Sequence, residues 1–584
     1  MAQRDGLTDW DLVAEAAQKP GPEEWAARRA QERRLGVVIG GSLSEGLRVR
    51  LDRQIVIEDV AVGRYVVSEG QSRRFFSMIT DVALDAANPA LEKNPPDLSD
   101  DFLRKVHHGT SIYGRLDVTP LLVMVEGERE PRPVKTVPNH YSIVANATPE
   151  EVNRVLGQAD EKHLHIGRPI EMEEAKVYLN LARLVERSSG VFGKSGTGKS
   201  FLTRILLTGV IKQNVAVSLI FDMHNDYGWE IRDKATGRLV KGLKQLCGSR
   251  VEIFTLDPES SLRRNSPYNT AVTIGYDEIQ PEDLEMLRET KNFSDLMIGA
   301  AYTLARRLGP RWLYRFLAAS EALDDASEGD EEAAQIIESL REKGNIAAGT
   351  LEGLVRRLSG LTRYPFLKKE VRESAVQKIF DYLNRGISVV LEFGRYGNSL
   401  EAYLLVANFL TRRLHERYVQ AVEKALGDAA QEPPHLVIVV EEAHKFLDPQ
   451  IARQTIFGTI ARELRKYNVT LLVVDQRPSG IDPEVMSQIG TRITCLLDDE
   501  ADIRAVFTGI SGAGELRNVL ARLDNREQAL ILGYAVPMPV VVQTRKYDEA
   551  FYEEVGLLEG EALQAKAARN RRILQPDAES EGLD

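Results

Sequence analysis

The sequence predicts an α/β fold organised around a parallel sheet, with a small all-β domain ahead of it. From about residue 176 apolar strand-like runs alternate with amphipathic helical stretches, the pattern typical of parallel sheets. Before that point the chain is made of short β runs broken by Gly, Asp and Pro. Strands of the parallel sheet are expected at 190–193, 216–222, 251–256, 388–393, 435–441, 469–475 and 492–497.

The all-β part predicts a small barrel or a sandwich, two folds that the sequence leaves open. Its expected strands contain alternating apolar residues and lie within 36–51, 62–70, 110–118, 120–127 and 163–171. The stretch 88–103, rich in Pro, Asn and Asp, is expected to be a loop inside this domain.

Changes in composition along the chain predict its domain boundaries. A helical, highly charged texture between two groups of strands indicates an insertion in the α/β domain. The expected segments are a charged helical leader over 1–34, a β-barrel over 35–175, an α/β core over 176–276 and 387–545, a helical insertion over 277–386, and a C-terminal helical segment with an acidic tail over 546–584.

Bulk composition limits the class of protein. The 584 residues carry a formal net charge of −12, which argues against a surface that is basic throughout but leaves room for a locally basic groove. There are 2 cysteines, Cys247 and Cys495, which fits a reducing compartment and offers no ligand set for zinc. No apolar run approaches the roughly 18 residues of a membrane-spanning helix. The sequence therefore predicts a soluble, cytoplasmic protein.

A phosphate-binding loop follows the first predicted strand of the α/β core. The pattern G-x-x-x-x-G-K-S runs from Gly193 to Ser200, between an apolar strand and an amphipathic helix, which is the context this motif requires. Lys199 is placed to reach the β- and γ-phosphates of ATP, and the Ser200 hydroxyl to bind Mg²⁺. The predicted nucleotide contacts are Gly193, Lys194, Ser195, Gly196, Thr197, Gly198, Lys199, Ser200 and Phe201.

The buried run 436–440 leads directly into Glu441 and Glu442. A P-loop enzyme needs acidic residues at the end of a second strand, which we expect beside the P-loop strand. Glu441 takes the Mg²⁺-side position, where Asp is more common, so its contact with the ion runs directly or through a water molecule. Glu442 is the predicted general base.

Further polar residues follow other predicted strands. Gln476 comes after 469–475 and either senses the γ-phosphate and orients the attacking water or bonds loop backbone. Asp222 and Asp226 either face the nucleotide or cap the turn that follows 216–222. Arg462 and Arg465 belong to one helix end and either complete a neighbouring subunit's site or form a solvated face.

Together these features resemble HerA, a family in the HerA/FtsK group of ring-forming DNA-translocating ATPases. The resemblance rests on a β domain followed by "GKSGTGKS", an insertion, "VVEEAH" and "RELRKYNVTLLVVDQRPS". It implies a RecA-like P-loop ATPase core with an N-terminal small β-barrel and a helical insertion. The stretch "DMHNDY" is similar to the family's D-x-H-G-E-Y, so Asp222 matches, whereas Asn225 and Asp226 depart from the pattern.

By this resemblance, Lys199, Ser200, Glu442 and Gln476 act within one subunit on ATP and Mg²⁺. Arg465, or failing that Arg462, acts on the neighbour's site. Arg187, twelve positions before Lys199, matches a family arginine associated with the ATP site.

The resemblance also implies a homohexamer with double-stranded DNA in its central pore. A partner on the barrel face would be a NurA-like nuclease, giving a helicase for DNA-end resection and repair by homologous recombination. The alternative is an ATPase that scaffolds and gates a Sir2-like or nuclease effector in anti-phage defence. Arg263, Arg264 and Lys445 lie in loops that either face DNA or are merely solvated.

Overall fold

The computed structural model describes residues 33–556 except 98, 108–110, 126–130, 158, 171, 233–236, 321–329, 427–431, 453–454, 464–465, 511–512 and 525–526. Residues 1–32 of the predicted leader over 1–34 and most of the predicted tail over 546–584 therefore lie outside the described residues, and Arg34 already belongs to the first strand of the barrel. Residues 549–556 are helical.

The N-terminal domain is a β-barrel rather than a sandwich. Its strands pair in the order β2-β1-β7-β3-β4-β5-β6, and a further pairing of β2 with β5 closes the barrel. Alternating side chains from these strands, among them Val49, Val66 and Leu116, fill its interior. The strands are β1 (Arg34–Ser42), β2 (Gly46–Leu51), β3 (Tyr65–Glu69), β4 (Arg73–Ala86), β5 (Ile112–Val125), β6 (Arg132–Pro133) and β7 (Ile143–Asn146).

Three expectations about the β region were wrong in detail. The runs 110–118 and 120–127 form one strand, β5, which continues through Pro120. The stretch 88–103 is not only loop, because it contains α3 (Ala90–Lys93) and the start of α4 (Asp101–His107). The run 163–171 leaves the barrel altogether, since β8 (His163–Pro169) pairs with strands of the larger sheet.

That larger sheet has twelve strands in the order β15-β14-β18-β11-β19-β20-β10-β21-β22-β23-β8-β9. Its first eight strands are parallel, and the last four join antiparallel. All seven predicted strands are present. The bounds are β8 (His163–Pro169), β9 (Val177–Asn180), β10 (Ser189–Phe192), β11 (Val217–Asp222), β14 (Val251–Thr255), β15 (Thr270–Ala271), β18 (Ser388–Glu392), β19 (Leu436–Glu441), β20 (Val469–Asp475), β21 (Thr491–Thr494), β22 (Gln528–Gly533) and β23 (Val540–Thr544).

Helices cover the sheet, which is why its central strands are mostly apolar. Every residue of β11, β19 and β20 is buried, as expected for strands covered on both faces. The helices of this part are α5 (Pro149–Leu156), α6 (Leu181–Glu186), α7 (Lys199–Lys212), α8 (Leu243–Cys247), α9 (Pro258–Arg263), α16 (Ala375–Asn384), α17 (Leu400–Lys424), α18 (Ile456–Glu463), α19 (Pro483–Gln488), α20 (Glu500–Val506) and α21 (Ala513–Ala521).

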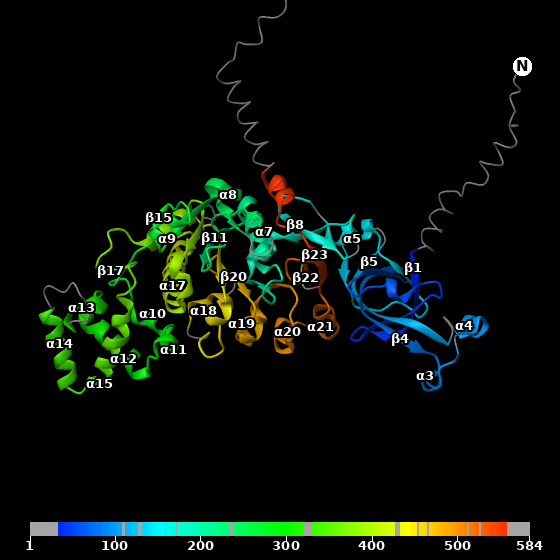
Figure 1. The fold of residues 1–584 in the computed structure, drawn as a ribbon, viewed down its shortest axis with the longest axis horizontal. Helices are drawn as coiled ribbons and strands as arrows, with labels where there is room; N and C mark the ends of the chain where they lie inside the picture. Colours follow the sequence, from blue (N-terminus) through cyan, green and yellow to red (C-terminus); the bar gives the residue numbers. More distant parts are fainter. Residues whose placement is uncertain are drawn as a thin grey trace, which may run out of the picture.

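The segment between β15 and β18 is mainly helical, as predicted. Figure 1 shows its helices at one end of the molecule and the barrel at the other, with the large sheet between them. The elements are β16 (Ile274–Gly275), α10 (Pro281–Glu285), α11 (Arg288–Lys291), α12 (Asp295–Leu308), α13 (Trp312–Ala319), α14 (Glu331–Glu342), α15 (Ala348–Leu358) and β17 (Leu367–Lys368). A two-stranded ribbon of β12 (Ile231–Arg232) and β13 (Leu239–Val240) follows β11.

The expectation that the acidic strand lies beside the P-loop strand was wrong. β20 separates β19 from β10, so the Gln476 strand is the direct neighbour of the P-loop strand. The reason is that chain order does not determine sheet order when helices connect parallel strands.

The barrel packs against the sheet through its own core residues. Tyr65 and Phe76 belong to the same hydrophobic cluster as the sheet residues, and the Val541 N–H donates to the Tyr65 hydroxyl at 3.2 Å. Arg522 after α21 pairs with Asp81 of β4 at 2.7 Å. Within the described ranges, no helix combines the length and apolarity needed to cross a bilayer.

Candidate nucleotide-binding site

The P-loop connects β10 to α7 through left-handed backbone that suits glycine. Gly196 has φ 81° and Gly198 has φ 96°. A Cβ atom on Gly193 would lie 2.8 Å from Cβ of Cys495, so only glycine fits there. Neighbouring strands anchor the loop, since the Gly193 N–H donates to the Asp475 carbonyl at 3.3 Å and the Lys194 N–H to the Leu496 carbonyl at 3.1 Å.

Lys199 is the first residue of α7 and is largely buried. Its Nζ donates to the carbonyl oxygen of Lys194 at 2.8 Å, so the side chain folds over the loop. Burial lowers the pKa of Lys199, and the nearby groups of Cys495, Glu442 and Asp475 oppose that shift. The P-loop lysine and the acidic strand end are therefore close enough to interact electrostatically.

The other predicted P-loop residues have distinct positions. Thr197 donates from Oγ1 to the Lys194 carbonyl at 2.9 Å, and Lys194 pairs with Asp498 at 2.7 Å. Ser195 is exposed at the loop tip, and Ser200 begins the helix beside Lys199. The ring of Phe201 stacks on Tyr547, with 6.0 Å between the ring centroids, so its side chain contacts the segment after β23.

Glu441 is held in place by two tyrosines from other parts of the chain. The Tyr227 hydroxyl donates to Oε1 of Glu441 at 2.9 Å, and the Tyr403 hydroxyl donates to the Glu441 carbonyl oxygen at 3.0 Å. Burial raises the pKa of Glu441 to about 8, the charge of Asp222 adds to the rise, and the Tyr227 hydrogen bond opposes it. Oε2 of Glu441 is buried and has no hydrogen-bond partner among the described residues.

This unpaired oxygen fits a divalent cation. Mg²⁺ prefers oxygen ligands and is usually held by one or two protein groups together with water and phosphate oxygens. Oε2 of Glu441 and the hydroxyl of Ser200 supply ligands of that chemistry, and Glu441 contributes to the electrostatic surroundings of Lys199, the residue before Ser200. The residues present therefore fit the predicted ion.

Glu442 has an unusual backbone for a glutamate, with φ 50° and ψ 46°. This left-handed step turns the chain out of β19, and the side chain is about a quarter exposed, at 27%. Nε2 of Gln476 donates to Oε1 of Glu442 at 2.8 Å. The amide of Gln476 thus contacts the predicted base, which supports the first of the two roles that the sequence left open.

Two residues that sequence reasoning did not select, His444 and Asp475, join these strand ends. Oδ2 of Asp475 accepts the backbone N–H of His444 at 2.7 Å, and Nδ1 of His444 lies 3.0 Å from the same oxygen. The pair ties the turn after Glu442 to the end of β20. His444 lies in the motif "VVEEAH" and Asp475 in the motif "LLVVDQRPS", but nothing in the sequence indicates that the two side chains meet.

Asp222 fastens its own loop rather than facing the nucleotide. It is fully buried, and its carboxylate accepts the N–H groups of Asp226 at 2.7 Å, Tyr227 at 2.8 Å and Gly228 at 3.3 Å. Burial raises the pKa of Asp222 to about 7, and the adjacent Glu392 adds to the rise. The structure therefore supports the turn-capping alternative for Asp222 over direct nucleotide binding.

The candidate arginines lie apart from the P-loop of their own subunit. Arg187 immediately precedes Ser188 and β10, so the four residues of that strand, at about 3.3 Å each, separate it from Gly193. Its guanidinium packs over the Tyr534 ring, 4.9 Å from the centroid. The Arg462 guanidinium on α18 donates to the carbonyl oxygen of Ala452, before that helix, at 3.2 Å, so part of the guanidinium is bonded within its own subunit. Arg465 lies outside the described residues.

Comparison with known proteins agrees with this geometry. The chain matches the family model of the HerA helicase central domain over residues 164–414, and that of the HAS barrel domain over residues 35–131. The DNA double-strand break repair helicase HerA of Sulfurisphaera tokodaii is 23% identical, covering 88% of this chain and 93% of the relative. The protein of the same name from Saccharolobus solfataricus is 24% identical, covering 88% of this chain and 92% of the relative.

Among solved structures, the plasmid coupling protein TrwB in complex with ADP and Mg²⁺ aligns with a TM-score of 0.43 and 14% identity, over 68% of this chain and 96% of that one. Two family models match successive parts of the chain, and the two relatives align along 88% of it. The chain is therefore similar to HerA helicases over its central part, residues 164–414, and to HAS barrel domains over residues 35–131.

Proposed function

We propose that this protein is an ATP-driven double-stranded DNA translocase that works as a homohexameric ring. The main support is the meeting of Lys199, Glu442 and Gln476 at one edge of the sheet, which is the set of groups that nucleoside triphosphate hydrolysis requires. The relatives' names, DNA double-strand break repair helicase, favour duplex DNA as the track.

Each residue has a defined part in the proposed reaction. Lys199 and the P-loop N–H groups hold the β- and γ-phosphates, and Lys199 balances their charge. Glu442 accepts a proton from the attacking water. As this happens, the oxygen of the water bonds to the γ-phosphorus, and the bond between the γ-phosphorus and the oxygen that bridges it to the β-phosphate breaks. Gln476 orients that water and Glu442. Ser200 and Glu441 would hold Mg²⁺, which would supply charge stabilisation for the phosphate oxygens.

The hexamer is proposed because the two candidate arginines that the structure describes, Arg187 and Arg462, contact other parts of their own subunit rather than its P-loop. Arg187 lies at the amino-terminal edge of β10, opposite the P-loop, so it reaches a nucleotide only across a subunit interface. Arg465 is the second candidate for this role, by family resemblance. An arginine supplied by a neighbour would make hydrolysis depend on assembly.

Mixing two inactive variants tests that arrangement. Subunits with Lys199→Ala and subunits with Arg187→Ala should each be inactive alone, whereas mixed rings should regain part of the ATPase activity. In mixed rings some interfaces pair an intact P-loop with an intact arginine. Failure of every mixing ratio to restore activity would contradict a trans role for Arg187.

Translocation itself is tested by ATP-dependent displacement of streptavidin from biotinylated linear duplex DNA. The parent protein should displace streptavidin and Glu442→Gln should not. Displacement at equal rates without ATP would contradict the proposal.

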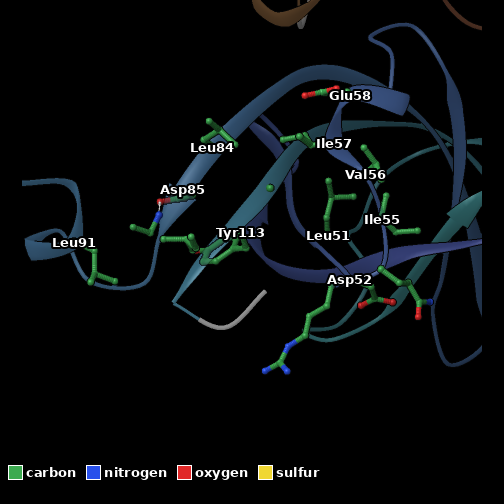
Figure 2. A pocket seen from close by; sticks show the side chains of 15 residues that line it. Leu51, Asp52, Ile55, Val56, Ile57, Glu58, Leu84, Asp85, Leu91 and Tyr113 are labelled. Atoms are coloured by element: carbon green, nitrogen blue, oxygen red, sulfur yellow. Dashed lines mark hydrogen bonds between the residues drawn. The ribbon is translucent and has the colours of Figure 1, made fainter. Parts of the chain in front are cut away.

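We further propose that the barrel carries the partner, a NurA-like nuclease in DNA-end resection. The barrel has an apolar cavity of about 500 Å³, lined by residues of the β2–β3 connection, β4, α3 and β5. Figure 2 shows Leu51, Ile57, Leu84 and Tyr113 around it. Leu84 is 82% exposed beside this cavity, and exposed apolar surface of this kind is typical of protein interaction sites.

The variant Leu84→Asp tests the docking surface without disturbing the core, because Leu84 is so exposed. It should weaken binding of a purified NurA-like nuclease from the same organism at least tenfold while leaving the ATPase rate unchanged. Leu296→Asp on α12, where the side chain is 74% exposed, is the matched control. Equal effects of the two variants would count against the barrel as the docking site.

The same cavity favours a second candidate function, an ATPase that scaffolds and gates a Sir2-like or nuclease effector in anti-phage defence. In that case the effector's activity should respond to ATP binding alone. Effector activity that is the same in the parent and in Glu442→Gln would favour this candidate over the translocase.

A further inference from the structure

Tyr227 connects the loop after β11 to the metal-side glutamate of β19. Its side chain is fully buried, and its hydroxyl donates to Oε1 of Glu441 at 2.9 Å, although 214 positions separate the two residues. Its backbone N–H donates to Asp222 at 2.8 Å, and its ring lies 5.9 Å from the guanidinium carbon of Arg204 on α7. Tyr227 is therefore held at its backbone and along its ring.

The hydroxyl contact determines how the Glu441 carboxylate is turned. A carboxylate without fixed partners rotates and offers either oxygen to a ligand. Here Oε1 is occupied by Tyr227, and the Tyr403 hydroxyl fixes the Glu441 carbonyl at 3.0 Å. Oε2 remains buried and without a hydrogen-bond partner within the described ranges. The two tyrosines thus leave one oxygen in a defined orientation.

We propose that Tyr227 is a positioning residue for the divalent cation: its hydroxyl holds Oε1 of Glu441 so that Oε2 alone serves the ion or a water bound to it. This inference rests on the Mg²⁺-dependent ATP hydrolysis proposed above. It also accounts for how a glutamate can serve at a position where aspartate is more common. The longer side chain rotates more freely, and the Tyr227 hydroxyl restricts that rotation.

The direct test compares Tyr227→Phe with Tyr418→Phe. Both tyrosines are buried, but the Tyr418 hydroxyl has no hydrogen-bond partner in the part of the chain that the structure describes, so its removal controls for the loss of a buried hydroxyl. Mn²⁺ binding, in the presence of a non-hydrolysable ATP analogue, is measured by electron paramagnetic resonance. Nucleotide binding in EDTA is measured on the same samples.

Tyr227→Phe should weaken Mn²⁺ binding about tenfold, the lower end of the range for groups that orient metal ligands. The Mg²⁺ concentration for half-maximal ATPase activity should rise by a similar factor, and nucleotide binding in EDTA should stay unchanged. Tyr418→Phe should match the parent in all three measurements. Equal Mn²⁺ affinity in the two variants would overturn the proposal.

A double-mutant cycle separates positioning from a general structural role. If the hydroxyl acts through Glu441, Tyr227→Phe should have no further effect on Mn²⁺ binding in a Glu441→Gln background. Additive effects would overturn the proposal. If Glu441→Gln alone leaves Mn²⁺ affinity unchanged, the assignment of the metal to Glu441 fails first, which distinguishes the two failures.

Discussion

Glu442 adopts a left-handed backbone conformation that costs a non-glycine residue about 1–2 kcal/mol. Such strain persists where the surroundings hold it, and it tends to occur at functional sites. Here the buried strand β19, the hydrogen bond from Gln476 and the His444–Asp475 pair hold the turn. The strain lets two consecutive glutamates serve different parts of one site.

Glu442→Gln should lower the ATPase rate by about 10²–10⁴-fold, since that is the usual contribution of a positioned general base. The amide keeps the size and hydrogen-bonding capacity of the side chain, so ATP binding should be retained. Single-turnover hydrolysis and nucleotide titration measure the two effects. Normal turnover in this variant would show that another group takes the proton.

His435 gives a second prediction at this scale, for stability. Burial lowers the pKa of His435 to about 4, and its Nε2 lies 3.0 Å from Oγ1 of Thr470. Its stabilising contribution is complete above the unfolded pKa of 6.5 and is lost as pH falls from there towards 4, because only the unfolded chain takes up the proton.

Between pH 7.5 and pH 5 the parent should therefore lose about 2 kcal/mol more unfolding free energy than His435→Gln. Urea unfolding at the two pH values provides the measurement. Identical pH dependence in the two proteins would mean that His435 titrates normally in the folded state.

The residues of the site were largely readable from the sequence, whereas their partners were not. The P-loop and the paired glutamates stand in local motifs whose chemistry depends on spacing along the chain. Tyr227 and Glu441 meet across 214 positions, and a single sequence contains no signal for such a pair. For the same reason the sequence could not indicate the role of Asp222, because the three backbone N–H groups that it accepts are brought to it by the shape of the following loop.

At the scale of elements, individual strands were predicted more reliably than their neighbours in the sheet. The apolar runs of β19 and β20 indicate burial, but strand order depends on long-range packing. β8 shows the difficulty, because its alternating pattern suits a barrel as well as the edge of the large sheet, where it pairs with β23. Pairing across more than three hundred residues is invisible to local pattern.

The residue after α9, Arg264, fits neither alternative that the sequence left open, a DNA-facing or a merely solvated side chain, because it has a charged partner within the chain. Arg264 pairs with the fully buried Glu392 at the end of β18, at 2.7 Å. Burial raises the pKa of Glu392, and Arg264 opposes that rise. The arginine thus compensates a carboxylate inside the sheet edge. Arg263, the last residue of α9, is exposed.

Arg264→Gln should therefore lower the unfolding free energy by about 2 kcal/mol, because it leaves Glu392 without its charged partner. Arg263→Gln should change it by less than about 0.5 kcal/mol, as is usual for exposed side chains. Thermal or urea unfolding compares the two directly. Similar losses in both variants would contradict the ion pair's importance for stability.

At the scale of the whole molecule, the barrel and the helical insertion lie at opposite ends of the large sheet (Figure 1). The P-loop and Arg187 lie at opposite edges of that sheet. A ring built from such subunits would bring the arginine edge of one to the P-loop edge of the next, and would leave the barrel's apolar cavity available to a partner. ATP hydrolysis would then take place at the interfaces between subunits, and partner docking would use a separate surface on the barrel.

The most direct measurement is steady-state ATPase activity with and without linear duplex DNA, for the parent, Lys199→Ala and Glu442→Gln, with the oligomeric mass recorded on the same samples. The account predicts a hexamer whose turnover rises with duplex DNA and is lost in both variants. An ATPase rate that does not change with duplex DNA, even with a nuclease partner present, would contradict this account. Full ATPase activity in single subunits would contradict it as well.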